Sequence, residues 1–424
     1  MKLISFQKLG ENRNSPRLWL ESRRLETLGF SAGIPFSVEL RSNGIRLRPA
    51  VLSNNHVSKR IASGRERPII DVANRALLLP LDGFPEIKIE GSFNRIDVAA
   101  SVRGFHIRRR LETKPPFKTI EVFCGGGTLS AAISATDNFT LVAGVELEPK
   151  YADVWQHAHP DAILYQTDIR RVHATELPPH EVLVASIPCT SHSNLGRAKK
   201  SLAGKPELGD SGDLYLSVAE IVAHHLPLAC IFENVPAFAN SLACLSLTHH
   251  LRRLGYSIAQ TIVDPLNEWN EPQDRKRWIM VATLSSGFEI VSPLISFRGK
   301  AGEFLDPHAE SDRKEVERIA KSIEGLRRHN ERHSKLGHGF GFTTIDRDST
   351  RVPTIVRSYH KINTGPFVKT AYGLRLLHKE EVERLMGCKI DCAHYATAIE
   401  ILGQGVQTRV LRAVLEQLAG FLKK

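Results

Sequence analysis

The chain has 424 residues, a hydrophobic content of 42% and a formal net charge of +11, so its length allows two or three domains and a substantial core. This composition excludes a disordered chain, and no apolar run approaches the roughly 20 residues that cross a bilayer. The first residues lack a secretory apolar stretch, and the six cysteines form no CxxC pair. We therefore expect a cytoplasmic protein with no membrane partner and no metal site.

The positive charge lies almost entirely in the first quarter of the chain. Residues 1–116 contain 21 Lys and Arg against 11 Asp and Glu, a net charge of +10. Such a basic region is typical of proteins that bind a polyanion, because each neutralised phosphate releases counterions. A basic domain that is merely solvated accounts for the charge equally well.

The first section, residues 1–112, is expected to be a basic β module. Alternating segments at 36–41 and 45–48 flank the turn residues Ser42, Asn43 and Gly44, which predicts a hairpin. A second hairpin is expected at 87–98. Each hairpin follows a similar extended segment, Leu18–Glu21 or Ile69–Val72, so the section reads as a tandem repeat of one small β unit.

The segment from Pro16 to Leu40 resembles the SymE/AbrB group of small swapped-hairpin modules. That resemblance implies DNA binding or self-dimerisation through the N-terminal module. Residues Arg108–Pro116 follow, with four basic side chains and two prolines, and are predicted to be a stiff linker.

From residue 117 the pattern changes to strands that alternate with helices, which predicts a doubly wound, parallel α/β sheet. A helix is expected to begin at Thr128, and another to cover 213–225. The predicted strands are 119–123, 142–145, 163–165, 182–186, 229–232 and 279–282.

The alternation breaks between 284 and 369. A charged helix is expected at 311–335, followed by a glycine-aromatic loop at 337–342. Two further helices, 378–386 and 407–422, are predicted to close the chain and to complete the preceding domain.

A glycine turn and two acids indicate a site for an adenosine-bearing cofactor. Gly125, Gly126 and Gly127 follow the first predicted strand, where a backbone without side chains lets a ligand approach closely. Glu146 ends the second strand, at the position where an acid binds ribose hydroxyls, and Asp168 follows the third. The third spaced glycine of a dinucleotide site is missing, so S-adenosylmethionine fits better. A tight turn without ligand explains the glycines taken alone.

A nucleophile and an acid follow two neighbouring strands. Pro188 precedes Cys189, and Glu233 precedes Asn234 at the end of the next strand. A cysteine thiolate adds to carbon 6 of cytosine when a carboxylic acid protonates ring nitrogen 3, and the addition makes carbon 5 nucleophilic. The two side chains therefore predict methyl transfer to a pyrimidine ring.

Taken together, these motifs resemble the DNA (cytosine-5) methyltransferase family over residues 117–283 and 370–424. Eight segments match in the family's order, namely Phe123–Gly127, Glu146–Pro149, Thr167–Ile169, Pro188–Cys189, Glu233–Val235, Gln273–Arg277, Arg375–Leu385 and Gly403–Val406. The resemblance implies a Rossmann-like, S-adenosylmethionine-dependent methyltransferase domain that acts on double-stranded DNA. It also implies that residues 284–369 form a target-recognition domain, with Thr354 near its end.

Residue roles follow from the same resemblance. Cys189 is the nucleophile and Glu233 the acid; Arg277 is expected to bind the carbonyl oxygen of the base, and Arg275 to help hold Glu233 and the loop. Glycine-rich, basic residues 191–212 are expected to close over DNA. The expected cofactor-binding residues are Phe123, Gly125, Gly126, Gly127, Glu146, Asp168, Ile169, Pro188, Leu214, Gln404 and Val406.

Three departures from the family pattern affect loop geometry rather than reacting atoms. Ile187 replaces a proline, Thr190 a glutamine, and Gln404-Gly405 an asparagine-serine pair. Two other functions stay open, a transfer-RNA cytosine-5 methyltransferase and a non-enzymatic DNA-binding regulator with a degenerate methylase domain. The sequence does not distinguish a solitary enzyme from one with a cognate restriction endonuclease.

Overall fold

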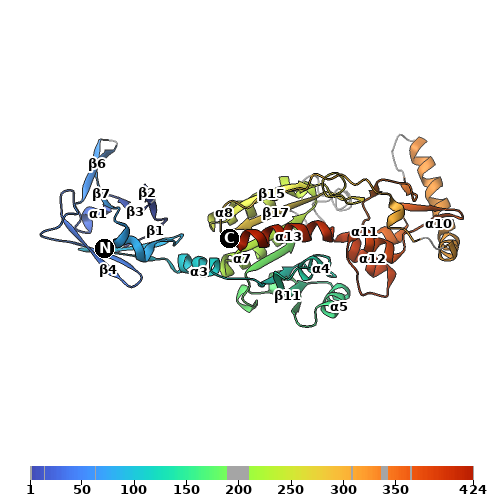
Figure 1. Cartoon of the computed structure of the whole chain (residues 1–424), viewed down its shortest axis with the longest axis horizontal. Helices are drawn as coiled ribbons and strands as arrows, with labels where there is room; N and C mark the ends of the chain where they lie inside the picture. Colours follow the sequence, from blue (N-terminus) through green and yellow to red (C-terminus); the bar gives the residue numbers. More distant parts are fainter. Residues whose placement is uncertain are drawn as a thin grey trace. The chain divides into compact units, whose positions relative to one another are not determined.

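The computed structural model describes residues 2–13, 15–62, 64–188, 210–306, 309–335, 342–362 and 365–423. The chain divides into two compact units, Met1–Thr113 and Lys114–Lys424 (Figure 1). Within these described residues, no helix is both long enough and apolar enough to span a membrane.

The first unit contains two antiparallel sheets around one apolar core. One sheet has the order β1-β8-β9-β5-β4 and the other the order β2-β3-β7-β6. Leu18, Phe36 and Ile70 are among the side chains that form the core. The elements are β1 (Leu3–Gln7), β2 (Gly10–Asn12), β3 (Ser15–Glu21), α1 (Arg24–Thr27), β4 (Phe36–Arg41), β5 (Gly44–Pro49), β6 (Ser58–Ala62), β7 (Arg65–Val72), α2 (Arg75–Leu78), β8 (Ile87–Ser92), β9 (Arg95–Ala100) and α3 (Val102–Leu111).

The two hairpins expected from the sequence are present as β4–β5 and β8–β9, and the repeats that contain them pair with each other. In β3 and β7, Leu18 faces Val72 and Leu20 faces Ile70. In β5 and β9, Ile45 faces Val98 and Leu47 faces Ile96. If each residue is replaced by its equivalent in the other repeat, both sets of residue pairs stay the same, so the two repeats are related by two-fold symmetry. A second copy of the chain is therefore not required to complete these sheets.

The predicted linker at 108–116 is wrong in its first part. Helix α3 runs from Val102 to Leu111, and the Ser101 hydroxyl caps it by accepting a hydrogen bond from the Gly104 N–H at 2.8 Å. A serine N-cap stabilises a helix by about 1 kcal/mol. The basic run of the linker is thus the end of a helix, and only the residues from 112 to 116 lie outside regular secondary structure.

The second unit is built on a seven-stranded sheet of order β12-β11-β10-β13-β14-β17-β15. The predicted parallel pairing is confirmed from β12 to β14, but β17 runs antiparallel to both β14 and β15. The sheet is therefore mixed. Its strands are β10 (Phe117–Val122), β11 (Phe139–Glu146), β12 (Ile163–Gln166), β13 (Val182–Ser186), β14 (Ala229–Asn234), β15 (Ser257–Val263) and β17 (Arg277–Thr283).

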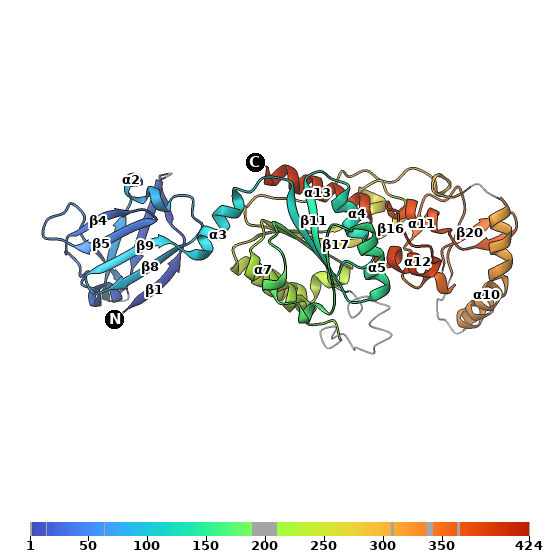
Figure 2. The same cartoon turned by 90° about the horizontal axis from the view of Figure 1, so that it is seen from below.

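Helices cover both faces of this sheet, as a doubly wound fold requires (Figure 2). On one face, side chains of α4 (Thr128–Ser134) and α13 (Thr408–Leu422) share a core with Val182, Val184 and Ile279. On the other, Thr248 of α8 (Leu242–Arg253) contacts Met280. Helix α7 (Leu214–His225) packs with α8, and α5 (Pro149–Ala158) follows β11. The last helix, α13, thus packs against α4, the first helix of the domain.

The residues after β17 form a second apolar core with α11 and α12. Ile319, Ile355 and Phe367 lie in this core together with Leu385 and Leu402, so it spans the expected boundary at 369/370. The remaining elements are α9 (Pro265–Glu268), β16 (Gln273–Asp274), α10 (Ala309–Lys335), β18 (Thr344–Ile345), β19 (Val352–Pro353), β20 (Phe367–Thr370), β21 (Gly373–Arg375), α11 (Lys379–Met386) and α12 (Tyr395–Gln404).

Candidate active site

Glu233 lies at the carboxyl end of β14 and is held by two side chains. Its side chain is 4% exposed. Ser186, its register partner at the end of β13, donates a hydrogen bond to Oε2 at 2.7 Å. The Nε atom of Arg277, the first residue of β17, lies 2.9 Å from Oε1. A buried carboxylate needs such partners, because desolvation without them is costly. The mixed sheet thus fixes both oxygens of Glu233.

Asn234 links the end of β14 to the chain that leads to Cys189. Its side-chain amide donates to the Ile187 carbonyl at 2.9 Å, and its own carbonyl oxygen accepts from the Val235 N–H at 2.8 Å. Ile187 is buried and Pro188 half-buried. The approach to the predicted nucleophile is therefore tied to the strand that carries the predicted acid.

Two predicted features lie outside the described residues. Cys189 and Thr190 fall in the range 189–209, as does most of the predicted closing loop at 191–212, and the glycine-aromatic loop falls largely in 336–341.

Arg275 has a different set of contacts from the one expected. Its guanidinium donates to the backbone carbonyls of Ile355 at 2.8 Å and Gly403 at 2.9 Å, and also to that of Gly405. The ion pair with Glu233 is made by Arg277 instead. Arg275 lies between β16 and β17, whereas Arg277 is the first residue of β17, and only the tertiary structure decides which of the two reaches the carboxylate. Buried Arg275 thus connects its own segment to those that contain Ile355 and Gly403–Gly405.

Thr354 supports the same segment. Its hydroxyl donates to the backbone carbonyl of Asp274, the residue before Arg275. The parallel bridge between β16 and β19 pairs Gln273 with Val352. Thr354 therefore helps to fix the backbone just before Arg275 and Arg277.

The glycine turn after β10 adopts the left-handed backbone that its residues allow. Gly125 and Gly127 have φ values of 54° and 95°, and Phe123, at 61°, is an uncommon non-glycine example. The Gly125 N–H donates to Glu146 Oε2 at 2.7 Å, and the Glu148 N–H donates to Oε1 at 2.8 Å. Burial raises the pKa of Glu146, whereas these hydrogen bonds stabilise the carboxylate and partly oppose the rise.

The C-terminal segment packs on this turn. A Cβ atom at Gly126 would lie 2.4 Å from Ile401 of α12, and one at Gly125 would lie 3.5 Å from the Gln404 amide nitrogen. Gln404 thus lies beside the predicted cofactor turn although it is 279 residues away in sequence. Val406, two residues further on, is 1% exposed and belongs to the apolar core that α4 and α13 share with the sheet.

Asp168 is brought close to the start of α7. Its carboxylate accepts from the Arg170 backbone N–H and guanidinium, each at 3.0 Å. Arg170 also bonds Asp213 at 3.1 Å, the residue before Leu214. Ile169 and Leu214 are buried, with 2% and 8% exposure. The structure therefore places these predicted residues together.

A buried polar network beneath the turn was not predicted. Glu121 of β10 is fully buried; it accepts hydrogen bonds from the Ser130 hydroxyl and, at 3.3 Å, from the Trp155 indole. Desolvation raises the pKa of Glu121 to about 8, so the carboxyl is neutral at neutral pH. An acid between two apolar residues of the strand, Ile120 and Val122, was the available signal.

The residues at the turn fit an adenosine-bearing ligand. A carboxylate has about four acceptor positions. Backbone N–H groups occupy at least one position on each oxygen of Glu146, and the remaining acceptor capacity suits a ribose diol. Among the described residues, no group of three His, Cys, Asp or Glu is arranged to hold a metal ion.

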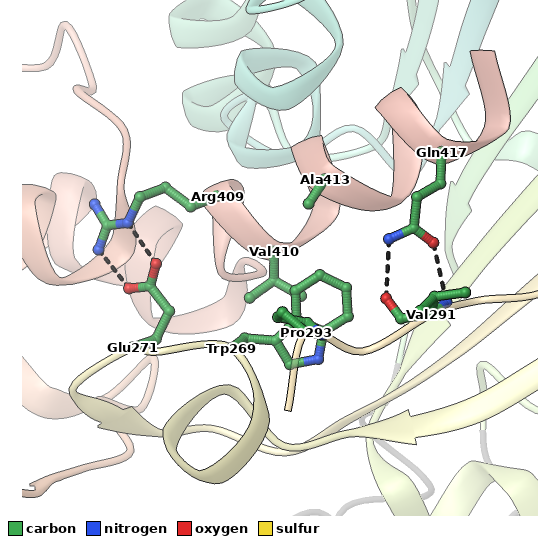
Figure 3. A pocket seen from close by; sticks show the side chains of 8 residues that line it. All are labelled: Trp269, Glu271, Val291, Pro293, Arg409, Val410, Ala413 and Gln417. Carbon is green, nitrogen blue, oxygen red and sulfur yellow. Dashed lines mark hydrogen bonds and ion pairs between the residues drawn. The ribbon is translucent and has the colours of Figure 1, made fainter. Parts of the chain in front are cut away.

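A separate cavity of about 400 Å³ lies between α13 and the chain around Trp269 (Figure 3). Arg409 bonds Glu271 at 2.6 Å, and the Gln417 side-chain amide donates to the Val291 carbonyl at 2.9 Å. None of its lining residues belongs to the predicted catalytic or cofactor set. These contacts fasten the last helix to the segments before and after β17.

Comparisons with known proteins give a consistent result. The family model described as C-5 cytosine-specific DNA methylase matches residues 117–420. The type II methyltransferase M.MspI of a Moraxella species is 27% identical over 336 residues, which cover 75% of this chain and 74% of that protein. M.NlaX of Neisseria lactamica is 26% identical over 317 residues, covering 72% and 97% of the two chains.

Solved structures share the fold. Dnmt2 methyltransferase of S. pombe has a TM-score of 0.58 at 19% identity, covering 73% of this chain and 99% of its own. The methyltransferase EhMeth of Entamoeba histolytica also has a TM-score of 0.58, at 18% identity, with coverage of 74% and 100%. The family model covers well over half of the sequence, and the chain belongs to the C-5 cytosine-specific DNA methylase family.

Proposed function

We propose that this enzyme transfers a methyl group from S-adenosylmethionine to carbon 5 of cytosine in double-stranded DNA, through a covalent adduct with Cys189. The observation that carries the proposal is the arrangement at the ends of β13 and β14. Glu233 is held there by Ser186 and Arg277, and the Asn234 amide fixes the chain two residues before Cys189. These contacts support one site that contains both an acid and a nucleophile.

In this mechanism the Cys189 thiolate adds to carbon 6 of the base, while Glu233 donates a proton to ring nitrogen 3. The electron pair displaced to carbon 5 attacks the methyl group. A base then removes the proton from carbon 5, and the thiolate leaves as the ring double bond re-forms and the proton on nitrogen 3 returns to Glu233. Arg277, 2.9 Å from Glu233, is positioned to orient the acid and to bind the ring carbonyl. The target base must leave the helix stack, at a cost of a few kcal/mol.

S-adenosylmethionine supplies an electrophilic methyl group and leaves as the neutral thioether. We assign its ribose to Glu146, its adenine to Asp168 and Ile169, and its remaining contacts to Phe123, the glycine turn, Pro188, Leu214, Gln404 and Val406. The free acceptor positions of Glu146 and the nearness of Gln404 to Gly125 support this assignment.

Residues 284–369 are proposed to recognise the target sequence, and 370–424 to complete the catalytic domain. The relatives named type II methyltransferases favour a restriction-modification role, in which a cognate endonuclease cuts the unmodified site.

The test is bisulfite sequencing of DNA from cells that express the chain, with Cys189→Ala as control. We expect one recurrent methylated cytosine context that is absent with the variant. Purified enzyme should also form a stable covalent complex with duplex DNA that contains 5-fluorocytosine, because fluorine at carbon 5 blocks the final proton loss.

No new 5-methylcytosine from folded, cofactor-binding protein would contradict the proposal. Methylation of transfer RNA without methylation of DNA would support the RNA alternative. Absence of both activities and of trapping would leave the DNA-binding regulator.

A further inference from the structure

A basic groove lies in the first unit, apart from every residue assigned above. It has a volume of about 650 Å³ and lies between the chain at the start of α1 and the β6–β7 hairpin. Four of its seven lining residues are arginines; the lining residues are Glu21, Ser22, Arg23, Arg24, Ala62, Arg65 and Arg67.

The groove keeps an excess of positive charge after its internal ion pairs are formed. Glu21 is the one carboxylate in the lining, and it lies 3.8 Å from Arg67 and 3.7 Å from Arg60. Arg23, Arg24 and Arg65 are exposed, and no ion pair joins any of them to another described residue. Three guanidinium groups are thus available to an external anion.

The backbone that carries these arginines is fixed by pairing between the two repeats. Glu21 of β3 faces Ile69 of β7, and the Ser22 N–H donates to the Pro68 carbonyl at 3.4 Å. Arg23 lies two residues after the end of β3, and Arg65 is the first residue of β7, the strand that pairs with β3. The cluster is a product of the fold and not of one local basic run.

We propose that this groove binds the phosphate backbone of duplex DNA and gives the enzyme a second, sequence-independent contact outside the methylation site. Arginine is suited to phosphate, because its planar donors match two oxygens at once. The lining has no aromatic side chain on which an unpaired base would stack, so a backbone is favoured over single-stranded bases. The choice of duplex DNA rests on the proposed function.

The experiment compares two triple variants of the full chain by fluorescence anisotropy with a labelled duplex over a salt series. The groove variant is Arg23→Gln, Arg24→Gln and Arg65→Gln. The control variant is Arg41→Gln, Arg48→Gln and Arg95→Gln, which changes the charge of the same unit equally at side chains that are 46% or 47% exposed. The two variants have equal net charge and differ in the position of the changed side chains and in their pairing, since the control arginines lie beside Glu39 or Asp97.

We expect the groove variant to bind at least about tenfold more weakly at low salt. The slope of log affinity against log salt should also fall by about 0.9 for each phosphate that the variant no longer neutralises. Hydroxyl-radical footprinting should show that the wild type and the control protect a longer stretch of backbone than the groove variant. Equal affinity, slope and footprint for the two variants would overturn the proposal.

Tighter binding of an RNA hairpin than of the duplex, abolished only in the groove variant, would also overturn the assignment to DNA. These readouts need no methyl transfer, so they stand if the proposed catalytic function fails. If that function holds, all three proteins should keep the same kcat on saturating DNA.

Discussion

Ser186 is the residue that the sequence did not single out and that the structure places against the predicted acid. Its hydroxyl donates to Glu233 at 2.7 Å from the adjacent strand. A hydrogen bond to a charged or reacting carboxyl is worth about 1.5–3 kcal/mol when it orients that group. Ser186 is therefore expected to be a positioning residue for the acid.

We expect Ser186→Ala to lower the single-turnover rate of methyl transfer by about tenfold or more. Ser186→Thr keeps the hydroxyl and should restore most of the rate, and the KM for S-adenosylmethionine should not change. Ser217→Ala, in α7, serves as the control. A wild-type rate for Ser186→Ala, or a loss that threonine does not restore, would disprove the positioning role.

Helix α12 and the glycine turn depend on each other for their packing. A Cβ atom at Gly126 would lie 2.4–2.7 Å from three atoms of Ile401, which is far inside van der Waals contact. Overpacking of this kind typically costs about 1–3 kcal/mol. We expect Gly126→Ala to lower the free energy of unfolding by that amount in urea, and to weaken cofactor binding.

A double variant isolates the contact. Gly126→Ala with Ile401→Ala should lose less stability than the two single changes added together, because the clash is absent. Gly325→Ala is the matched glycine control: it lies in helix α10 with open space around its Cβ position, and should stabilise by about 0.5–1 kcal/mol. Additive losses would contradict the packing explanation.

The stability of the second unit as a whole should depend on pH through Glu121. Burial raises its pKa from 4.5 to about 8, so between these values the folded protein keeps a proton that the unfolded chain has released. The free energy of unfolding therefore falls as pH rises through this window, by at most about 1.4 kcal/mol per pH unit, and levels off above it.

Glu121→Gln, which cannot titrate, should flatten this dependence and be the more stable protein at pH 8. Urea unfolding followed by tryptophan fluorescence reports this, since three of the four tryptophans, 155, 269 and 278, lie in the second unit. Parallel pH curves for wild type and variant would contradict the account. Glu146, whose pKa is also raised, is common to both proteins.

The sequence by itself determined the local elements and the family. Short apolar runs that alternate with helices predicted the strands from β10 to β14, and Cys189 and Glu233 after two neighbouring strands indicated the chemistry, because apolar runs and reacting side chains are properties of short segments. It predicted a linker from residue 108, where the structure has the last residues of helix α3, whose first turn is capped by Ser101.

Only the tertiary structure decided which distant residues meet. It gave the ion pair with Glu233 to Arg277 and turned Arg275 towards Gly403, and it ran β17 antiparallel beside β14. It also paired the two N-terminal repeats and so collected Arg23 and Arg65 in one groove. Contacts between residues far apart in sequence depend on strand order and side-chain packing, and a single sequence carries no local signal for either.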